Sequence, residues 1–124
     1  MNRPQHIDQR TAWHVICLCA QWCGACREWR LLFDRLAADH PRLQFTWVDI
    51  EDQADTVGDV DIETFPTLLV ARASEPRFYG PVQPVLIQID RLLGSLLADG
   101  AQSAPLPPEA RPLLDRLTSA GLLN

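Results

Sequence analysis

The stretch WHVICLCAQWCGACREWRLLFDRLAAD, residues 13–39, decides the expected fold. Its first part, residues 13–20, is apolar at odd and even positions alike, which is typical of a strand buried on both faces of an α/β sheet. From Gly24 to Asp39 the apolar residues recur at helical spacing, with charged residues between them. The stretch therefore predicts a central strand that leads directly into a long helix.

The rest of the chain supplies the partners of this strand and helix. Residues 42–50 alternate as a second strand, residues 67–73 and 77–82 form two more around a tight turn, and residues 84–100 read as a helix. A strand–helix–strand start implies a right-handed crossover with parallel pairing, whereas the tight turn implies an antiparallel hairpin. The predicted fold class is α/β, with a central mixed sheet of about four strands flanked by helices.

The length of 124 residues suits one domain, which we place at residues 1–100. Residues 101–124 are predicted as an addition, made of a Pro-rich linker and a short C-terminal helix with leucines on one side. We expect this helix to dock against its own domain. A dimer contact or a partner-binding helix is the alternative.

Composition excludes several classes of partner. The net charge is −5 and all eleven basic residues are Arg, so the acidic balance argues against nucleic-acid binding. No segment approaches the about 20 apolar residues of a membrane span, and the first residues lack the apolar core of a signal peptide. The expected location is therefore the cytoplasm, where structural disulfides are rare.

All four cysteines lie between Cys17 and Cys26, and three interpretations compete: a metal site, a disulfide framework, or a reactive pair with two bystanders. Cys17 and Cys19 stand two apart on a strand, about 6.5 Å between Cα atoms with poorly aimed side chains, which disfavours a disulfide between them. Zinc and iron–sulfur sites usually use two well-separated pairs, so a metal is the less favoured alternative. We predict no metal and no cofactor, and expect Cys17 and Cys19 to be inert core residues.

Cys23 and Cys26 are the predicted catalytic pair. Cys23 falls at the start of the long helix, where free backbone N–H groups and the positive end of the helix dipole stabilise a thiolate. Cys26 lies three residues further on, so that it can resolve a mixed disulfide formed by Cys23. A Cys-x-x-Cys near a βαβ pattern is a redox signal.

The motif Trp-Cys-Gly-Ala-Cys at residues 22–26, with Thr64-Phe65-Pro66 before another strand, resembles the thioredoxin family. The resemblance covers roughly residues 12–100 and implies the thioredoxin fold. It also implies that Pro66 is cis, lies beside the cysteine pair and helps to dock the substrate backbone. Trp22, Thr64, Phe65 and Pro66 are therefore the expected substrate-binding residues.

One departure from the family affects the chemistry. Thioredoxins usually carry a buried acid six residues before the first cysteine, and here that position is Cys17. The proton of Cys26 must then leave through water or another acid. We expect Glu63, which is close in sequence to Pro66, to take it.

These features predict a thiol–disulfide oxidoreductase that reduces or exchanges disulfides in protein substrates. Its partners would be those substrates and an electron-donating reductase, with no nucleic acid and no membrane. The alternative is a non-enzymatic chaperone or adaptor of the same fold. It would bind a partner through the same groove or through the C-terminal segment.

Overall fold

The computed structural model describes residues 12–20, 22–58, 62, 66–99 and 106–123. Its single described sheet has the strand order β2-β1-β3-β4, with β1 and β2 parallel and the other neighbours antiparallel. The strands are β1 (Trp13–Cys19), β2 (Leu43–Asp49), β3 (Thr67–Arg72) and β4 (Glu75–Pro81), and the helices are α1 (Gly24–Asp39), α2 (Ala54–Val57), α3 (Leu86–Asp99) and α4 (Ala110–Ser119). The predicted α/β class, the mixed sheet and the helix at 24–39 are confirmed.

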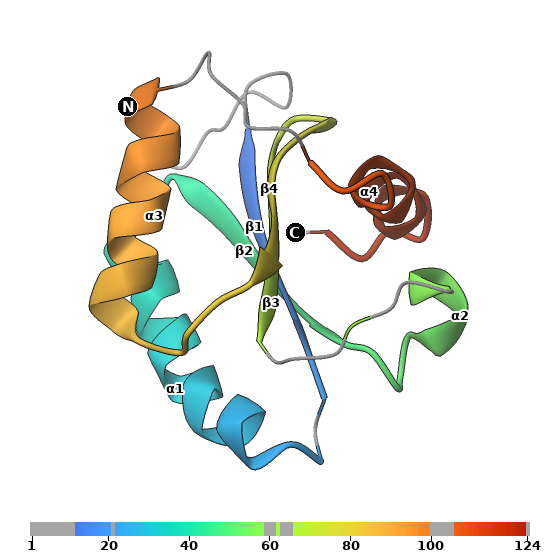
Figure 1. Ribbon diagram of the computed structural model, residues 1–124, viewed down its shortest axis with the longest axis horizontal. Helices are drawn as coiled ribbons and strands as arrows, with labels where there is room; N and C mark the ends of the chain where they lie inside the picture. Colours follow the sequence, from blue (N-terminus) through green and yellow to red (C-terminus); the bar gives the residue numbers. More distant parts are fainter. Residues whose placement is uncertain (1–11, 21, 59–61, 63–65, 100–105, 124) are drawn as a thin grey trace, which may run out of the picture.

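The elements form three layers. In Figure 1 the helices α1 and α3 lie on one side of the sheet, and α2 and α4 lie on the other. Successive side chains of a strand point to opposite faces, so β1 contributes to both cores. Val15, Cys17 and Cys19 pack toward α1 and α3, whereas Ile16 and Leu18 pack toward α4. This two-sided burial explains why β1 is apolar at every position.

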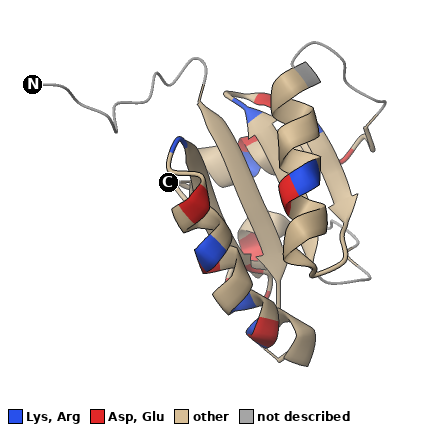
Figure 2. Ribbon diagram, turned by 90° about the vertical axis from the view of Figure 1, so that its left-hand side faces the viewer, with Lys and Arg blue, Asp and Glu red and all other residues tan. Residues whose placement is uncertain are grey.

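Helix α1 lies on the sheet through one buried stripe, formed by Cys26, Trp29, Phe33 and Leu36. The ring of Phe33 lies 5.6 Å from that of Trp47 on β2, centroid to centroid, in an edge-on contact. The charged residues of α1 occupy its outer surface (Figure 2). The stripe fixes the rotation of α1, and its first turn therefore directs Cys26 toward the end of β1.

Helix α4 covers the opposite face with four buried residues, Ala110, Leu113, Leu114 and Leu117. They share a core with strand residues such as Ile16 and Leu69. Arg116 adds a polar link to α2: its guanidinium donates to the Thr56 carbonyl at 2.9 Å and to the Val57 carbonyl at 2.7 Å. The C-terminal helix thus docks on the sheet of its own chain, as expected, although the predicted boundary at residue 100 stays a prediction.

Some element ends differ from the sequence expectation. The hairpin turns at Ala73, whose φ is 54°, so β4 begins at Glu75 instead of residue 77. Helix α4 begins at Ala110 rather than 113 because Pro112 falls in its first turn, where a missing N–H costs nothing. Neither shift moves the end of the sheet where α1 begins.

Replacing Leu114 by Ala tests how strongly α4 contributes to the fold. Leu114 is fully buried, and a buried Leu→Ala change leaves a cavity, so we expect a loss of about 2–5 kcal/mol in the free energy of unfolding. Leu31→Ala is the matched control, since Leu31 is 75% exposed on α1 and its truncation should change stability by less than about 0.5 kcal/mol. Denaturant unfolding measures both; equal effects would contradict the role given to α4.

Candidate functional site

The site is built around the first turn of α1, at the end of the sheet where β1 stops. Cys23 is the N-cap of α1, with an extended backbone (φ −84°, ψ 123°) and no side-chain capping bond. Its thiol is free and partly exposed. The first N–H groups of a helix have no partner within the helix, so an anion at this position is stabilised. The arrangement places a free thiol, accessible to a partner, at the start of α1.

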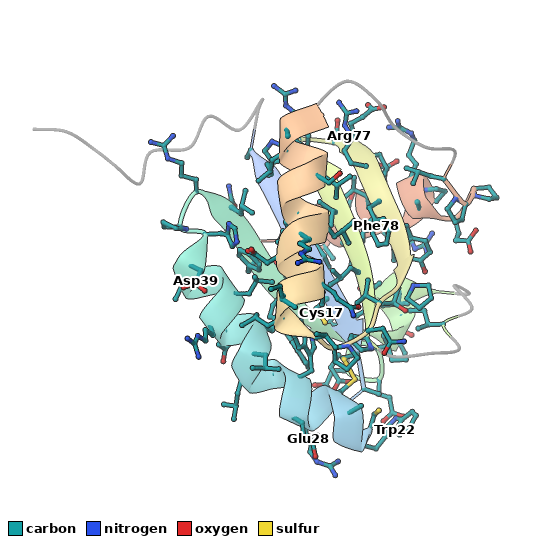
Figure 3. All side chains as sticks on the ribbon, turned by 60° about the vertical axis from the view of Figure 1, so that its left-hand side comes forward. Cys17, Trp22, Glu28, Asp39, Arg77 and Phe78 are labelled. Carbon is teal, nitrogen blue, oxygen red and sulfur yellow. A yellow bond between two sulfur atoms is a disulfide. The ribbon has the colours of Figure 1, made fainter. Side chains whose placement is uncertain are left out.

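Trp22 directly precedes Cys23 in the chain, lies on the surface (Figure 3) and is 59% exposed. Its indole Nε1 donates a hydrogen bond to Glu51 Oε2 at 2.7 Å. Glu51 follows β2, so this bond connects the segment before α1 to the segment after β2. The indole is thereby held in place one residue before Cys23, with much of its surface open to a partner.

Cys26 forms a disulfide with Cys19, and not with Cys23. The two Cα atoms are 5.8 Å apart, within the usual range for a disulfide, and both residues are fully buried. The expectation that Cys19 is inert is therefore wrong. Cys19 is the last residue of β1 and faces α1, while the buried stripe of α1 brings Cys26 down onto that same spot.

Part of the signal for this pairing is present in the sequence. The residues of β1 that face α1 are every second residue up to Cys19, which includes both strand cysteines. Of the two, Cys19 is the last residue of β1 and lies nearer to the start of α1 along the chain.

Cys17 is the deeper of the two strand cysteines. It is fully buried, and burial raises the pKa of its thiol to about 12. Cys17 therefore stays protonated at neutral pH, in agreement with the expected inert core role. It also cannot accept a proton there, as a carboxylate at this position would.

A pocket of about 360 Å³ opens beside the first turns of α1, and it is lined by Cys26, Arg27, Arg30, Trp47, Asp49 and Asp52. Asp49 comes from the end of β2, whose parallel register places it opposite Cys19. One of its carboxylate oxygens, Oδ1, accepts the backbone N–H groups of Glu51 at 2.9 Å and Asp52 at 3.2 Å. The structure thus brings a carboxylate close to Cys26 that sequence reasoning did not single out, although parallel pairing of the first two strands points to it.

The predicted substrate loop is described only at its last residue. Pro66 is buried and comes directly before β3, and its carbonyl accepts the backbone N–H of Val82 at 3.0 Å. Since the next residue, Thr67, pairs with Leu18, Pro66 lies at the same end of the sheet as the cysteines. Glu63, Thr64 and Phe65 lie outside the described residues, and their roles stay predictions.

Within the described ranges, no group of three or more His, Cys, Asp or Glu side chains is placed to hold a metal ion. Two of the four sulfurs are bonded to each other, and a metal ligand must be a thiolate. None of the described helices is long and apolar enough to cross a membrane.

Several known proteins are similar to this chain in sequence. The family model for thioredoxin matches residues 2–83. The chain is 32% identical over 62 residues to "Putative thioredoxin 2" of Streptomyces coelicolor, covering 50% of this chain and 46% of that protein. It is 31% identical over 61 residues to thioredoxin H2-1 of Oryza sativa, covering 49% and 44%. The chain thus matches less than half the length of these relatives.

Solved structures show the same fold. The thioredoxin of Fasciola hepatica superposes with a TM-score of 0.63 at 18% identity, covering 70% of this chain and 83% of that one. Oxidized mitochondrial thioredoxin 3 of Saccharomyces cerevisiae gives 0.61 at 17% identity, covering 71% and 82%. At such identities the likeness concerns the fold alone. Because the family model covers well over half of the sequence, including the cysteine motif, this chain belongs to the thioredoxin family.

Proposed function

We propose that this chain is a thiol–disulfide oxidoreductase that reduces disulfides in protein substrates. The observation that carries the proposal is Cys23, a free and partly exposed thiol at the N-terminal end of α1. Membership of the thioredoxin family and the disulfide formed by Cys26 support the same chemistry. We also propose a cytoplasmic location, where reduction is the favoured direction and a reductase returns the electrons.

In the proposed reaction the Cys23 thiolate attacks one sulfur of a substrate disulfide. A mixed disulfide forms, and the other substrate sulfur leaves as a thiolate. Cys26 lies one helical turn further along α1, and residues three apart on a helix share a face. Its thiolate then attacks the sulfur of Cys23 and releases the reduced substrate.

The substrate would lie across the exposed indole of Trp22 and the segment Thr64-Phe65-Pro66. Support comes from the position of Pro66 at the cysteine end of the sheet and from the large exposed area of Trp22. Aromatic surface of this kind is common at protein contacts because it offers area at low entropic cost.

The adaptor hypothesis is the second candidate, and one observation favours it. Cys17 stands where the family usually has its acid, and its raised pKa makes it unable to replace that acid. A contact through the C-terminal leucines is disfavoured, because Leu113, Leu114 and Leu117 are buried against the sheet of this chain. An adaptor would therefore have to use the exposed surface around Trp22.

Cys26→Ser separates the two functions. Without the resolving thiol, the mixed disulfide with Cys23 should accumulate and be released by dithiothreitol. Mass spectrometry of adducts captured from a lysate, or formed with a model protein disulfide, measures it. Cys26→Ser/Cys23→Ser is the matched control and should capture nothing. If Cys26→Ser also captures nothing, and the unchanged protein fails to reduce the model disulfide, the adaptor hypothesis is supported instead.

Glu63→Gln tests the proposed acceptor for the Cys26 proton. General base catalysis contributes about 10²–10⁴-fold, so loss of the acceptor should slow disulfide reduction at neutral pH by at least the lower value and change the pH profile. Asp49→Asn is measured alongside, because Asp49 lines the pocket with Cys26. A pH profile unchanged by Glu63→Gln rules out Glu63, and a changed profile for Asp49→Asn alone assigns the role to Asp49.

A further inference from the structure

Three cysteines, and not two, meet at the start of α1. Cys26 is bonded to Cys19 on the sheet side, while Cys23 stands one turn earlier on the helix with a free thiol. Figure 3 shows the disulfide as a yellow bond between the position of Cys17 in the sheet and that of Trp22 at the surface. Cys26 therefore has one possible disulfide partner within the core and another toward solvent.

We propose that Cys19 is a third redox-active cysteine. By internal disulfide exchange it replaces Cys23 as the disulfide partner of Cys26. The proposal rests on the proposed function, because Cys23 must first receive the oxidising equivalents from a substrate disulfide. In this scheme the Cys19–Cys26 disulfide forms after Cys23–Cys26 and is the final state of the oxidised chain.

The exchange needs no further oxidant. Reaction with the substrate leaves a Cys23–Cys26 disulfide and two reduced substrate thiols. The Cys19 thiolate then attacks Sγ of Cys26; the Cys19–Cys26 bond forms, the Cys23–Cys26 bond breaks, and Cys23 leaves as a thiolate. The proton lost by Cys19 balances the one that Cys23 takes up, so the chain stays oxidised by the same two electrons throughout.

The position of Cys19 distinguishes it from Cys17. Both face α1, but Cys19 ends β1 directly under the first turn of the helix, whereas Cys17 lies two residues deeper in the strand. The backbone N–H of Ala20 lies 3.3 Å from Sγ of Cys26, in position to donate to it. Cys26 is thus held at the end of β1, where it is bonded to Cys19, while the thiol of Cys17 stays free.

The leaving group, Cys23, and the product disulfide, Cys19–Cys26, lie in different surroundings. Cys23 is partly exposed at the N-terminal end of α1, so that its sulfur, on leaving, is in contact with solvent. The product disulfide is fully buried, so thiols in solution do not reach its sulfurs. Reduction of the resting form must therefore begin at Cys23 and run the exchange backwards.

Disulfide mapping tests the proposal, because Trp22 separates the two pairs in the sequence. The reduced protein is oxidised with a protein disulfide substrate, blocked with N-ethylmaleimide, denatured and cleaved with chymotrypsin after Trp22. A Cys19–Cys26 disulfide then joins two peptides, whereas Cys23–Cys26 stays within one. We expect the joined peptides to predominate over the single Cys23–Cys26 peptide, with N-ethylmaleimide on Cys23.

Three variants make the mapping decisive. Cys19→Ser should retain only the Cys23–Cys26 peptide, and its Cys23 should escape N-ethylmaleimide. Cys17→Ala is the matched strand control and should map like the unchanged protein. Cys23→Ser should form no joined peptides in the time that the unchanged protein needs, because the buried thiols do not meet the substrate.

The outcomes separate this proposal from the proposed function. If Cys26→Ser traps substrates but the oxidised protein holds only Cys23–Cys26, the exchange is refuted and the oxidoreductase stands. If Cys23→Ser forms the Cys19–Cys26 disulfide as fast as the unchanged protein, the exchange is also refuted, because that bond forms without Cys23. If the trap fails, the proposed function fails, and the exchange fails with it.

Discussion

The burial of β1 on both faces is the constraint on which the rest of the structure depends. One face of the strand needs α1 and α3 as a cover, and the other needs α2 and α4. Helix α1 follows β1 after a short connection, so its first turn lies over the strand's last residue. The packing of α1 on β1 that fills the core also places Cys26 against Cys19, so no additional loop is needed to bring the two cysteines together.

Much of the fold could be predicted because local patterns and packing agree. The doubly apolar 13–20 stretch, the helical spacing after Gly24 and the tight turn before β4 each indicate one structure, and they predict the parallel and the hairpin pairings. The pairing of β1 with β3, which completes the sheet order, is shown by the structure alone. The ends of the elements were harder to predict. The positive φ of Ala73 and the position of Pro112 in the first turn of α4 depend on tertiary packing, which the local sequence pattern does not show.

The site was only partly predictable, for a physical reason. Cys23 could be placed because a helix N-terminus is a local feature of the sequence. Strand alternation directs Cys19 toward α1, but the spacing of the cysteines does not show that Cys26 meets it, because that depends on how far α1 is rotated about its axis over β1. That rotation is set by how large side chains of α1, such as Trp29 and Phe33, pack against residues distant in the sequence, such as Trp47 on β2. Asp49 was missed for a similar reason, since only strand register brings it near.

The bond between Cys19 and Cys26 also ties the helix to the sheet covalently. The two residues are seven apart, and closing a loop of this size removes chain entropy from the unfolded state worth roughly 2.5 kcal/mol. A Cys23–Cys26 bond would close a much smaller loop within one turn of the helix. The oxidised chain would then resist heat and proteases better when Cys26 is bonded to Cys19 than when it is bonded to Cys23. Disulfide exchange would in this way change the stability of the folded chain as well as its reactivity.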